Sequence, residues 1–211
     1  FSVQSTGGAT ITSPANAPAS VYTLDANTAL HDDFETSTPG WTVTGNATTG
    51  AWTRGDPNGS DAQPEDDHSS AGTSCWFTGQ GPVGGAAGTA DVDGGQTVLT
   101  SPQFSLDGAA DAQVSFWLWY NNFAGAAPNA DVFTTQVSTD NGSTWLNADV
   151  VGPDTQTNFT GWALRSFNLL GVPGISISSQ VRIRFIADDS GSGSIVEAAI
   201  DDRAFAPSVC N

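Results

Sequence analysis

The stretch Ala112-Gln-Val-Ser-Phe-Trp-Leu-Trp-Tyr120 is the densest block of strand-forming apolar residues in the sequence. Its residues alternate in character, and one face carries Val114, Phe116, Leu118 and Tyr120. A period of two residues is typical of an extended strand with one buried face. We therefore predict a central strand over residues 112–120.

A second alternating stretch occupies residues 181–187 near the C-terminus. It places Val181, Ile183 and Phe185 on one face and two arginines on the other. Two long strands with apolar inner faces need partners and a second layer to cover them. No stretch shows a clean helical period, and the chain has 24 Gly and 11 Pro. These features predict an all-β fold, a two-sheet antiparallel β-sandwich or jelly roll.

The remaining strands are short and are separated by turn residues. We expect them near residues 74–78, 97–102, 132–138, 144–146, 162–169 and 195–205. The pair Asn141-Gly142 is a hairpin signal between two of these runs. Residues 1–30 are rich in Ser, Thr, Ala and Pro and predict a linker or N-terminal extension, with Val21–Leu24 as its only strand-like piece. The β-sandwich domain is expected to span residues 31–211.

The charge balance excludes some partners. The 211 residues include 22 acidic side chains and only five basic ones, for a formal net charge of −17. Such a surface repels phosphate backbones, so nucleic acid is not an expected partner. The sequence lacks an apolar run near the length of a membrane span, which argues against membrane insertion. Acidic clusters attract Ca²⁺, a cation that takes several oxygen ligands. The alternative is a solvated, salt-tolerant surface.

The termini and cysteines indicate an extracellular, secreted protein. The chain begins at Phe1 without a signal-like segment, so we expect a processed product or a piece of a larger protein. Cys75 and Cys210 are its only cysteines. An even count fits a disulfide that joins the middle of the chain to its C-terminal end. The alternative is a pair of free, buried thiols.

The sequence lacks the common catalytic patterns. It has only His31 and His68, no G-x-S-x-G elbow and no H-E-x-x-H motif, so we do not expect this chain to be an enzyme by itself. A glycosidase-type carboxylate pair is the catalytic alternative, but nothing places two of the three Glu across a cleft.

Acidic residues mark both ends of the predicted domain. Asp32, Asp33 and Glu35 lie at its start, and Asp201 and Asp202 lie in its last strand. First and last strands of a closed β fold commonly pair, so these carboxylates would meet and repel one another. A bound Ca²⁺ would offset that repulsion and stabilise the closure. The alternative is that the acids are solvated separately.

Several short motifs occur in an order that resembles MAM-like jelly-roll domains. They are Asp33-Phe-Glu35, Gly40-Trp41, Trp52-x-Arg54, Asp67-His68, Leu99-Thr-Ser-Pro102, Phe116-Trp-x-x-Tyr120 and Ala199-Ile-Asp-Asp202. The resemblance covers about residues 31–206 and is closest to the bacterial domains that follow the catalytic domain of secreted peptidases. The chain lacks the four-cysteine pattern of animal members, which argues against their type of adhesion.

The MAM resemblance implies an adhesive or accessory role beside an upstream catalytic domain. It also implies a cation site, here a calcium site, built from Asp33, Glu35, Asp67 and Asp201. The partner would be that catalytic domain, with a polysaccharide or protein substrate.

Two classes of function follow. The first is a non-catalytic, calcium-stabilised accessory domain of a secreted hydrolase, with a surface adhesin as a close variant. The second is a carbohydrate-binding module, because Trp117 and Trp119 share the face opposite the expected core, where flat rings can stack on sugars. Alternatively, these two rings pack against the second sheet.

Overall fold

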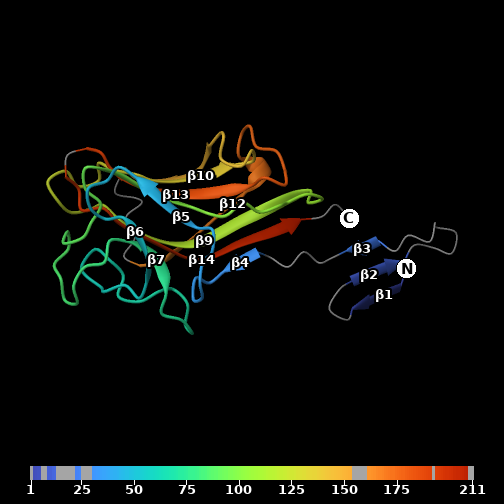
Figure 1. Cartoon of the computed structure of the whole chain (residues 1–211), viewed down its shortest axis with the longest axis horizontal. Helices are drawn as coiled ribbons and strands as arrows, with labels where there is room; N and C mark the ends of the chain where they lie inside the picture. The colour runs from blue at the N-terminus through green and yellow to red at the C-terminus, as the bar shows by residue number, and fades with distance from the viewer. Residues whose placement is uncertain are drawn as a thin grey trace.

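The computed structural model describes residues 2–5, 9–12, 22–24, 30–153, 161–191 and 193–208. Figure 1 shows two stacked sheets with a small separate sheet beside them. The strands are β1 (Ser2–Ser5), β2 (Ala9–Thr12), β3 (Tyr22–Leu24), β4 (Leu30–Asp32), β5 (Thr42–Gly45), β6 (Trp52–Gly55), β7 (Cys75–Thr78), β8 (Gly95–Thr100), β9 (Asp111–Asn121), β10 (Phe133–Ser138), β11 (Leu146–Val151), β12 (Ala163–Asn168), β13 (Arg182–Asp189) and β14 (Glu197–Ser208). A single 3₁₀ turn, η2 (Leu169–Gly171), is the helical element that the described residues contain.

The two large sheets are antiparallel and form the predicted β-sandwich. One sheet has five strands in the order β11-β10-β13-β8-β5. The other has six strands, in the order β12-β9-β14-β7-β6, with β4 added beside β14. Every strand pair in them is antiparallel. The prediction of an all-β, two-sheet fold is confirmed.

The core lies between these sheets. The alternating stretches of residues 112–120 and 181–187 both point their apolar faces into it. Strand β9 is internal to the six-stranded sheet, and it buries Val114, Phe116, Leu118 and Tyr120 completely. Strand β13 is the middle strand of the opposite sheet, and its Phe185 ring meets the Phe116 ring edge to face at 4.9 Å. Alternation in the sequence therefore identified the middle strand of the five-stranded sheet, whereas β9, predicted to be central, is an internal strand next to the edge of its sheet and β14 takes the middle place.

The outer edges of the two sheets are joined by an ion pair. Arg165 of β12 donates two hydrogen bonds to Asp149 of β11, at 2.6 and 2.7 Å. A forked guanidinium matches the two oxygens of a carboxylate, which fixes the geometry of such a pair. The contact therefore ties the edge strand of one sheet to the edge strand of the other.

The N-terminal stretch contains more strand than expected. Strands β1, β2 and β3 form a three-stranded antiparallel sheet outside the sandwich. Only the third was expected, because Pro-rich and Gly-rich segments surround the short runs of Val, Ile and Thr that form the other two. The division into an N-terminal extension of residues 1–30 and a domain of residues 31–211 stays a prediction.

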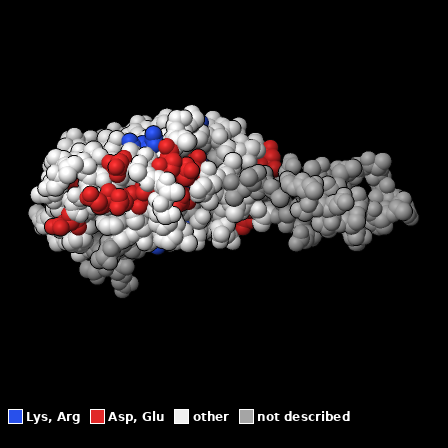
Figure 2. Space-filling view, turned by 90° about the horizontal axis from the view of Figure 1, so that it is seen from below, with Lys and Arg blue, Asp and Glu red and all other residues white. Residues whose placement is uncertain are grey.

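Two other expectations concern single features of the chain. Cys75 is completely buried in β7, whereas Cys210 lies outside the described residues, so the disulfide stays a prediction. None of the described helical segments is long and apolar enough to cross a membrane. Acidic side chains gather in neighbouring patches on the face shown in Figure 2, where few basic side chains are visible.

Candidate functional site

The first and last strands of the sandwich lie side by side. Strand β4 pairs with β14 in the register Asp32 to Arg203 and Leu30 to Phe205. The Arg203 guanidinium, which is 5% exposed, forms an ion pair with the Asp32 carboxylate. Asp32 is therefore occupied by an internal cation. The first and last strands pair as predicted. The acidic residues on either side of the Asp32–Arg203 ion pair are not neutralised by it.

A β-bulge in β14 places two consecutive acids on the same side. Asp201 lies opposite Trp117 of β9 and Ala204 lies opposite Ser115, so two residues of β14 face one residue of β9. Asp202 has a φ of 47°, in the left-handed region that is uncommon outside Gly, Asn and Asp. Successive residues in a regular strand point to opposite faces. Here both carboxylates contact the Ser69 hydroxyl instead.

Asp201 is fully buried and is held by backbone donors. Its carboxylate accepts hydrogen bonds from the backbone N–H groups of His68 at 2.9 Å, Ser69 at 3.2 Å and Asp202 at 2.8 Å. Burial, opposed by these bonds and reinforced by the Asp202 charge, raises the pKa of Asp201 to about 6. The backbone of the loop at residues 68 and 69 is thus attached to the last strand through the Asp201 carboxylate.

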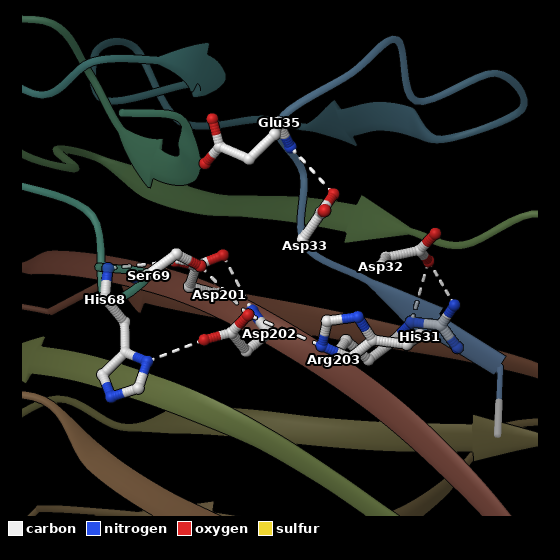
Figure 3. A network of polar contacts seen from close by, with 9 residues as sticks. All are labelled: His31, Asp32, Asp33, Glu35, His68, Ser69, Asp201, Asp202 and Arg203. Carbon is white, nitrogen blue, oxygen red and sulfur yellow. Dashed lines mark hydrogen bonds and ion pairs between the residues drawn. The ribbon is translucent and has the colours of Figure 1, made fainter. Parts of the chain in front are cut away.

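Asp202 is bonded to both histidines of the chain. Its Oδ2 lies 2.7 Å from His68 Nδ1, and its Oδ1 lies 3.5 Å from His31 Nε2. The His68 ring stacks on the Trp117 ring at a centroid distance of 3.8 Å. Figure 3 shows His31 of β4 and His68 of the loop before β7 on either side of Asp202 of β14.

Glu35 and Asp67 complete the acidic group. Glu35 accepts hydrogen bonds from the backbone N–H groups of Thr73 and Ser74, both at 3.0 Å. Asp67 Oδ2 is buried and has no hydrogen-bond partner among the described residues. Burial, contact with Glu35 and the nearby Asp201 charge raise the pKa of Asp67 to about 7. Desolvated, mutually repelling carboxylates are favourable only if they take up protons or share a cation.

We call Glu35, Asp67, Asp201 and Asp202 the closure cluster. Beside it lies an open hollow of about 620 Å³ that is lined by Glu35, Asp202, Asp33 and the loop of residues 68–72. Asp33 is exposed, and its Oδ1 accepts a hydrogen bond from the Glu35 N–H at 3.1 Å. Of the four predicted metal ligands, Asp67 contacts Glu35 and interacts with the charge of Asp201. Asp33 stands at the rim and orients Glu35.

The closure cluster fits a hard cation. Its donors are carboxylate oxygens, the kind that Ca²⁺ prefers, and one of them is buried without a partner. Gly72 packs so closely on Glu35 that an added Cβ would lie 1.9 Å from its Oε1. Among the described residues, the group of three His, Cys, Asp or Glu side chains whose ligand atoms all lie within 4.8 Å of one another is His68, Asp201 and Asp202, and it includes neither Glu35 nor Asp67. The sequence placed Asp202 among the carboxylates that a Ca²⁺ would join, but the predicted ligand set included neither Asp202 nor His68.

Trp117 and Trp119 do not form an open platform. Both lie on the outer face of the six-stranded sheet and are half-buried. His68 covers the first ring, and the second donates a hydrogen bond from Nε1 to the Ala62 carbonyl at 2.7 Å. The loop of residues 56–71 covers these rings, a third arrangement besides a sugar platform and packing against the second sheet.

Comparison with solved structures identifies similar folds. The K1 cleaved adhesin domain of Lys-gingipain from Porphyromonas gingivalis W83 superposes with a TM-score of 0.51 at 13% identity, over 87% of this chain and 99% of that domain. The K3 adhesin domain of the same protein gives 0.51 at 16% identity, over 83% and 97%. A structure described as a carbohydrate-binding module of the β-sandwich superfamily gives 0.53 at 10% identity, over 84% and 61%.

The likeness is one of fold. Comparison with models of known protein families gave no match, and comparison with curated proteins gave none either. The chain therefore has the β-sandwich architecture of adhesin and carbohydrate-binding domains.

Proposed function

We propose that this chain is a non-catalytic binding module of a larger secreted protein, and that Ca²⁺ in the closure cluster fastens its first strand to its last. One observation carries the proposal. Glu35 follows β4, Asp67 lies in the loop before β7, and Asp201 and Asp202 lie in β14, yet the Asp67 carboxylate interacts with each of the other three. A divalent ion there would neutralise carboxylates that would otherwise repel one another across the closure.

The polar groups of the site support binding rather than catalysis. His68 and Asp202 form a pair of the kind that activates serine nucleophiles. The neighbouring Ser69 hydroxyl, however, is bonded to Asp202 and Asp201 instead of the His68 ring. The ring is also stacked on Trp117. These contacts fix the loop and leave no nucleophile aligned with the histidine.

The similar folds suggest the kind of protein that carries such a module. The domains found by structural comparison are described as adhesins of a Lys-gingipain and as carbohydrate-binding modules. In keeping with the MAM-like motifs, we propose attachment to a secreted hydrolase, of which a peptidase is the favoured class. The Asp33-Phe-Glu35 and Asp201-Asp202 motifs that carry this resemblance are those that lie at the closure.

A specific surface favours a polysaccharide as the ligand. A polar row crosses all five strands on the outer face of the five-stranded sheet, with the members Asn147, Gln136, Arg184, Thr100 and Thr42 in register. Arg184 donates to Gln136 Oε1 at 2.6 Å, and its guanidinium lies 4.3 Å from the centre of the Trp145 ring. A ring beside planar hydrogen-bonding groups suits the apolar faces and hydroxyls of a sugar chain.

Thermal unfolding with and without calcium tests the metal part of the proposal. Removing Ca²⁺ with a chelator should lower the melting temperature by several degrees, since an ion that binds only the folded state stabilises it by mass action. Adding Ca²⁺ back should restore the melting temperature. A melting curve that does not respond to chelation or re-addition would contradict the calcium site. It would not bear on the proposed polysaccharide ligand.

Affinity electrophoresis in gels that contain soluble polysaccharides tests the ligand. We expect one or more polysaccharides to retard the chain, and Trp145→Ala to abolish the retardation. Leu164→Ala is the matched control, because Leu164 is an exposed residue of β12 in the other sheet. If no polysaccharide retards the native chain, a protein surface is the better partner class.

A further inference from the structure

A second group of buried polar side chains lies at the far end of the sandwich from the β4–β14 closure. Tyr120 is the penultimate residue of β9, Asn122 directly follows that strand, Asp131 lies two residues before β10, and Asp189 ends β13. We call these four residues the end cluster. Because β9 belongs to one sheet and β10 and β13 to the other, the cluster spans the gap between the two sheets.

Each member of the end cluster has a buried oxygen without a partner. The side chains are at most 7% exposed. Tyr120 OH, Asn122 Oδ1, Asp131 Oδ2 and Asp189 Oδ1 have no hydrogen-bond partner among the described residues. An unsatisfied buried polar atom costs about 1–3 kcal/mol, so four of them together point to something that binds there.

The orientation of the amide and the phenol is defined by their neighbours. Asn122 Nδ2 donates to the Asp131 carbonyl at 2.7 Å, so a flipped amide would set two oxygens against each other. Its Oδ1 therefore faces away from that carbonyl. Burial and the charges of Asp131, Asp188 and Asp189 raise the pKa of Tyr120, and a contact with the Asn122 side chain opposes that rise, so the hydroxyl lies near Asn122 and those carboxylates. The pKa of Asp189 is raised to about 6, first by burial and next by the charge of Asp131.

No positive side chain of the described residues neutralises the end cluster. The sequence contains five basic residues, all Arg. Each is engaged elsewhere: Arg54 with the Phe34 carbonyl, Arg165 with Asp149, Arg182 with Asn141, Arg184 with Gln136 and Arg203 with Asp32. Both histidines lie beside Asp202. The acids near the cluster, Asp91, Asp93 and Asp188, add negative charge.

We propose that the end cluster is a second divalent-cation site, taken by Ca²⁺ through Asp131, Asp189 and the Asn122 amide oxygen. Carboxylate and amide oxygens are the donors that Ca²⁺ takes in flexible geometry. The ion would supply the positive charge that the chain does not bring to these buried oxygens. It would also hold the connection of residues 122–131, which is bonded to residues 193–195 through Ala126, Ala124 and the Gly125–Ser194 bridge. The two cation sites are independent, because the end cluster shares no residue with the closure cluster.

Counting bound calcium in matched variants tests the proposal. Equilibrium dialysis of the full chain at pH 7.5 should show that Asp189→Asn and Asp131→Asn each bind one Ca²⁺ fewer per chain than the native protein. Asp201→Asn should independently lose the ion of the closure cluster, and the exposed Asp107→Asn should lose none. Unchanged stoichiometry in folded Asp189→Asn and Asp131→Asn would overturn the second site, whatever happens at Asp201.

A measurement that leaves the end cluster intact covers the case in which those variants do not fold. In the Asp201→Asn chain, adding Ca²⁺ should slow amide hydrogen exchange in residues 122–131 and 193–195. Exchange rates there that do not change with Ca²⁺ would show that the buried acids share protons instead, and would overturn the proposal.

Discussion

The closure cluster and the end cluster are both acidic, but the protein surrounds their carboxylates differently. Asp201 is as buried as Asp189, yet its oxygens accept three backbone hydrogen bonds, whereas Asp189 Oδ1 accepts none among the described residues. The chain thus uses one carboxylate as a structural anchor for a loop. The Asp189 carboxylate has no such anchor at Oδ1, and in our proposal a bound Ca²⁺ satisfies it. The same residue type therefore has opposite effects on stability in the two clusters when no metal is bound.

The largest difference should appear on removing the anchored carboxylate. Asp201→Ala leaves the N–H groups of His68, Ser69 and Asp202 without their acceptor. We expect a loss of about 3 kcal/mol in the free energy of unfolding, measured by urea denaturation, because buried donors lose their partners. Asp107→Ala, at an exposed site, should show no measurable loss. Equal effects of the two substitutions would remove the distinction between anchored and free acids.

A smaller effect is expected from crowding Glu35. In Gly72→Ala the new Cβ would meet Glu35 Oε1 at 1.9 Å and push the carboxylate away from Thr73 and Ser74. The lost hydrogen bonds should cost about 1–2 kcal/mol and weaken Ca²⁺ binding at the closure cluster, as measured by calorimetry. Gly81→Ala is the matched control, since its Cβ would meet nothing within 4 Å. If both variants bind Ca²⁺ as the native chain does, Glu35 is not a ligand.

The pH dependence of stability probes both clusters together. In the folded chain the pKa is raised to about 7 for Asp67 and to about 6 for Asp189 and Asp201, from the ordinary aspartate value of 3.8. The folded state therefore binds protons more tightly than the unfolded state between about pH 4 and pH 7.

This contribution to stability is fully present below about pH 4 and is lost as the pH rises through 7. We expect the melting temperature of the calcium-free chain to fall by a few degrees between pH 5 and pH 7.5, and saturating Ca²⁺ to reduce or reverse the fall. Scanning calorimetry across this range measures it. If the melting temperature changes with pH in the same way with and without Ca²⁺, the ion does not bind these carboxylates.

The smallest effect, with opposite sign, should come from Asp189. In the calcium-free chain at pH 7.5, the Asp189 carboxylate is a buried negative charge close to that of Asp131, and its Oδ1 has no hydrogen-bond partner among the described residues. Asp189→Asn removes this charge. We expect a gain of about 1 kcal/mol in the free energy of unfolding. Asp201→Asn under the same conditions should lose stability, and both are measured by urea denaturation. A loss for Asp189→Asn would mean that its carboxylate is anchored as well.

Sequence patterns predicted the sandwich better than they predicted its sites. Alternation identified β9 and β13 because a strand buried on one face must repeat every two residues. Asn141-Gly142 marked the β10–β11 hairpin, where both residues have positive φ. Most of the closure cluster could be predicted because Glu35, Asp201 and Asp202 lie at the two ends of the domain, whose strands were expected to pair. Asp67 came only from the MAM-like resemblance.

The end cluster was not visible in the sequence. Its members come from the end of β9, the connection between β9 and β10, and the end of β13. Tyr120 was counted only as a core residue because it shares the apolar face of β9. The position of Trp117 was also undecided, because alternation shows the face of a residue but not which loop folds over that face. Such features depend on contacts between segments distant in the sequence.

The pairing of β4 with β14 has a mechanical consequence. Leu30 lies opposite Phe205, so the chain leaves both strands in the same direction, as Figure 1 shows. A pulling force applied through these two ends would open the strand pair one hydrogen bond at a time, from Leu30 inward, instead of shearing all its bonds together. The first crosslink that such a peeling force meets is the Asp32–Arg203 pair, with Asp202 and Asp201 immediately behind it. An ion held there would set the load that the module withstands when it tethers one surface to another.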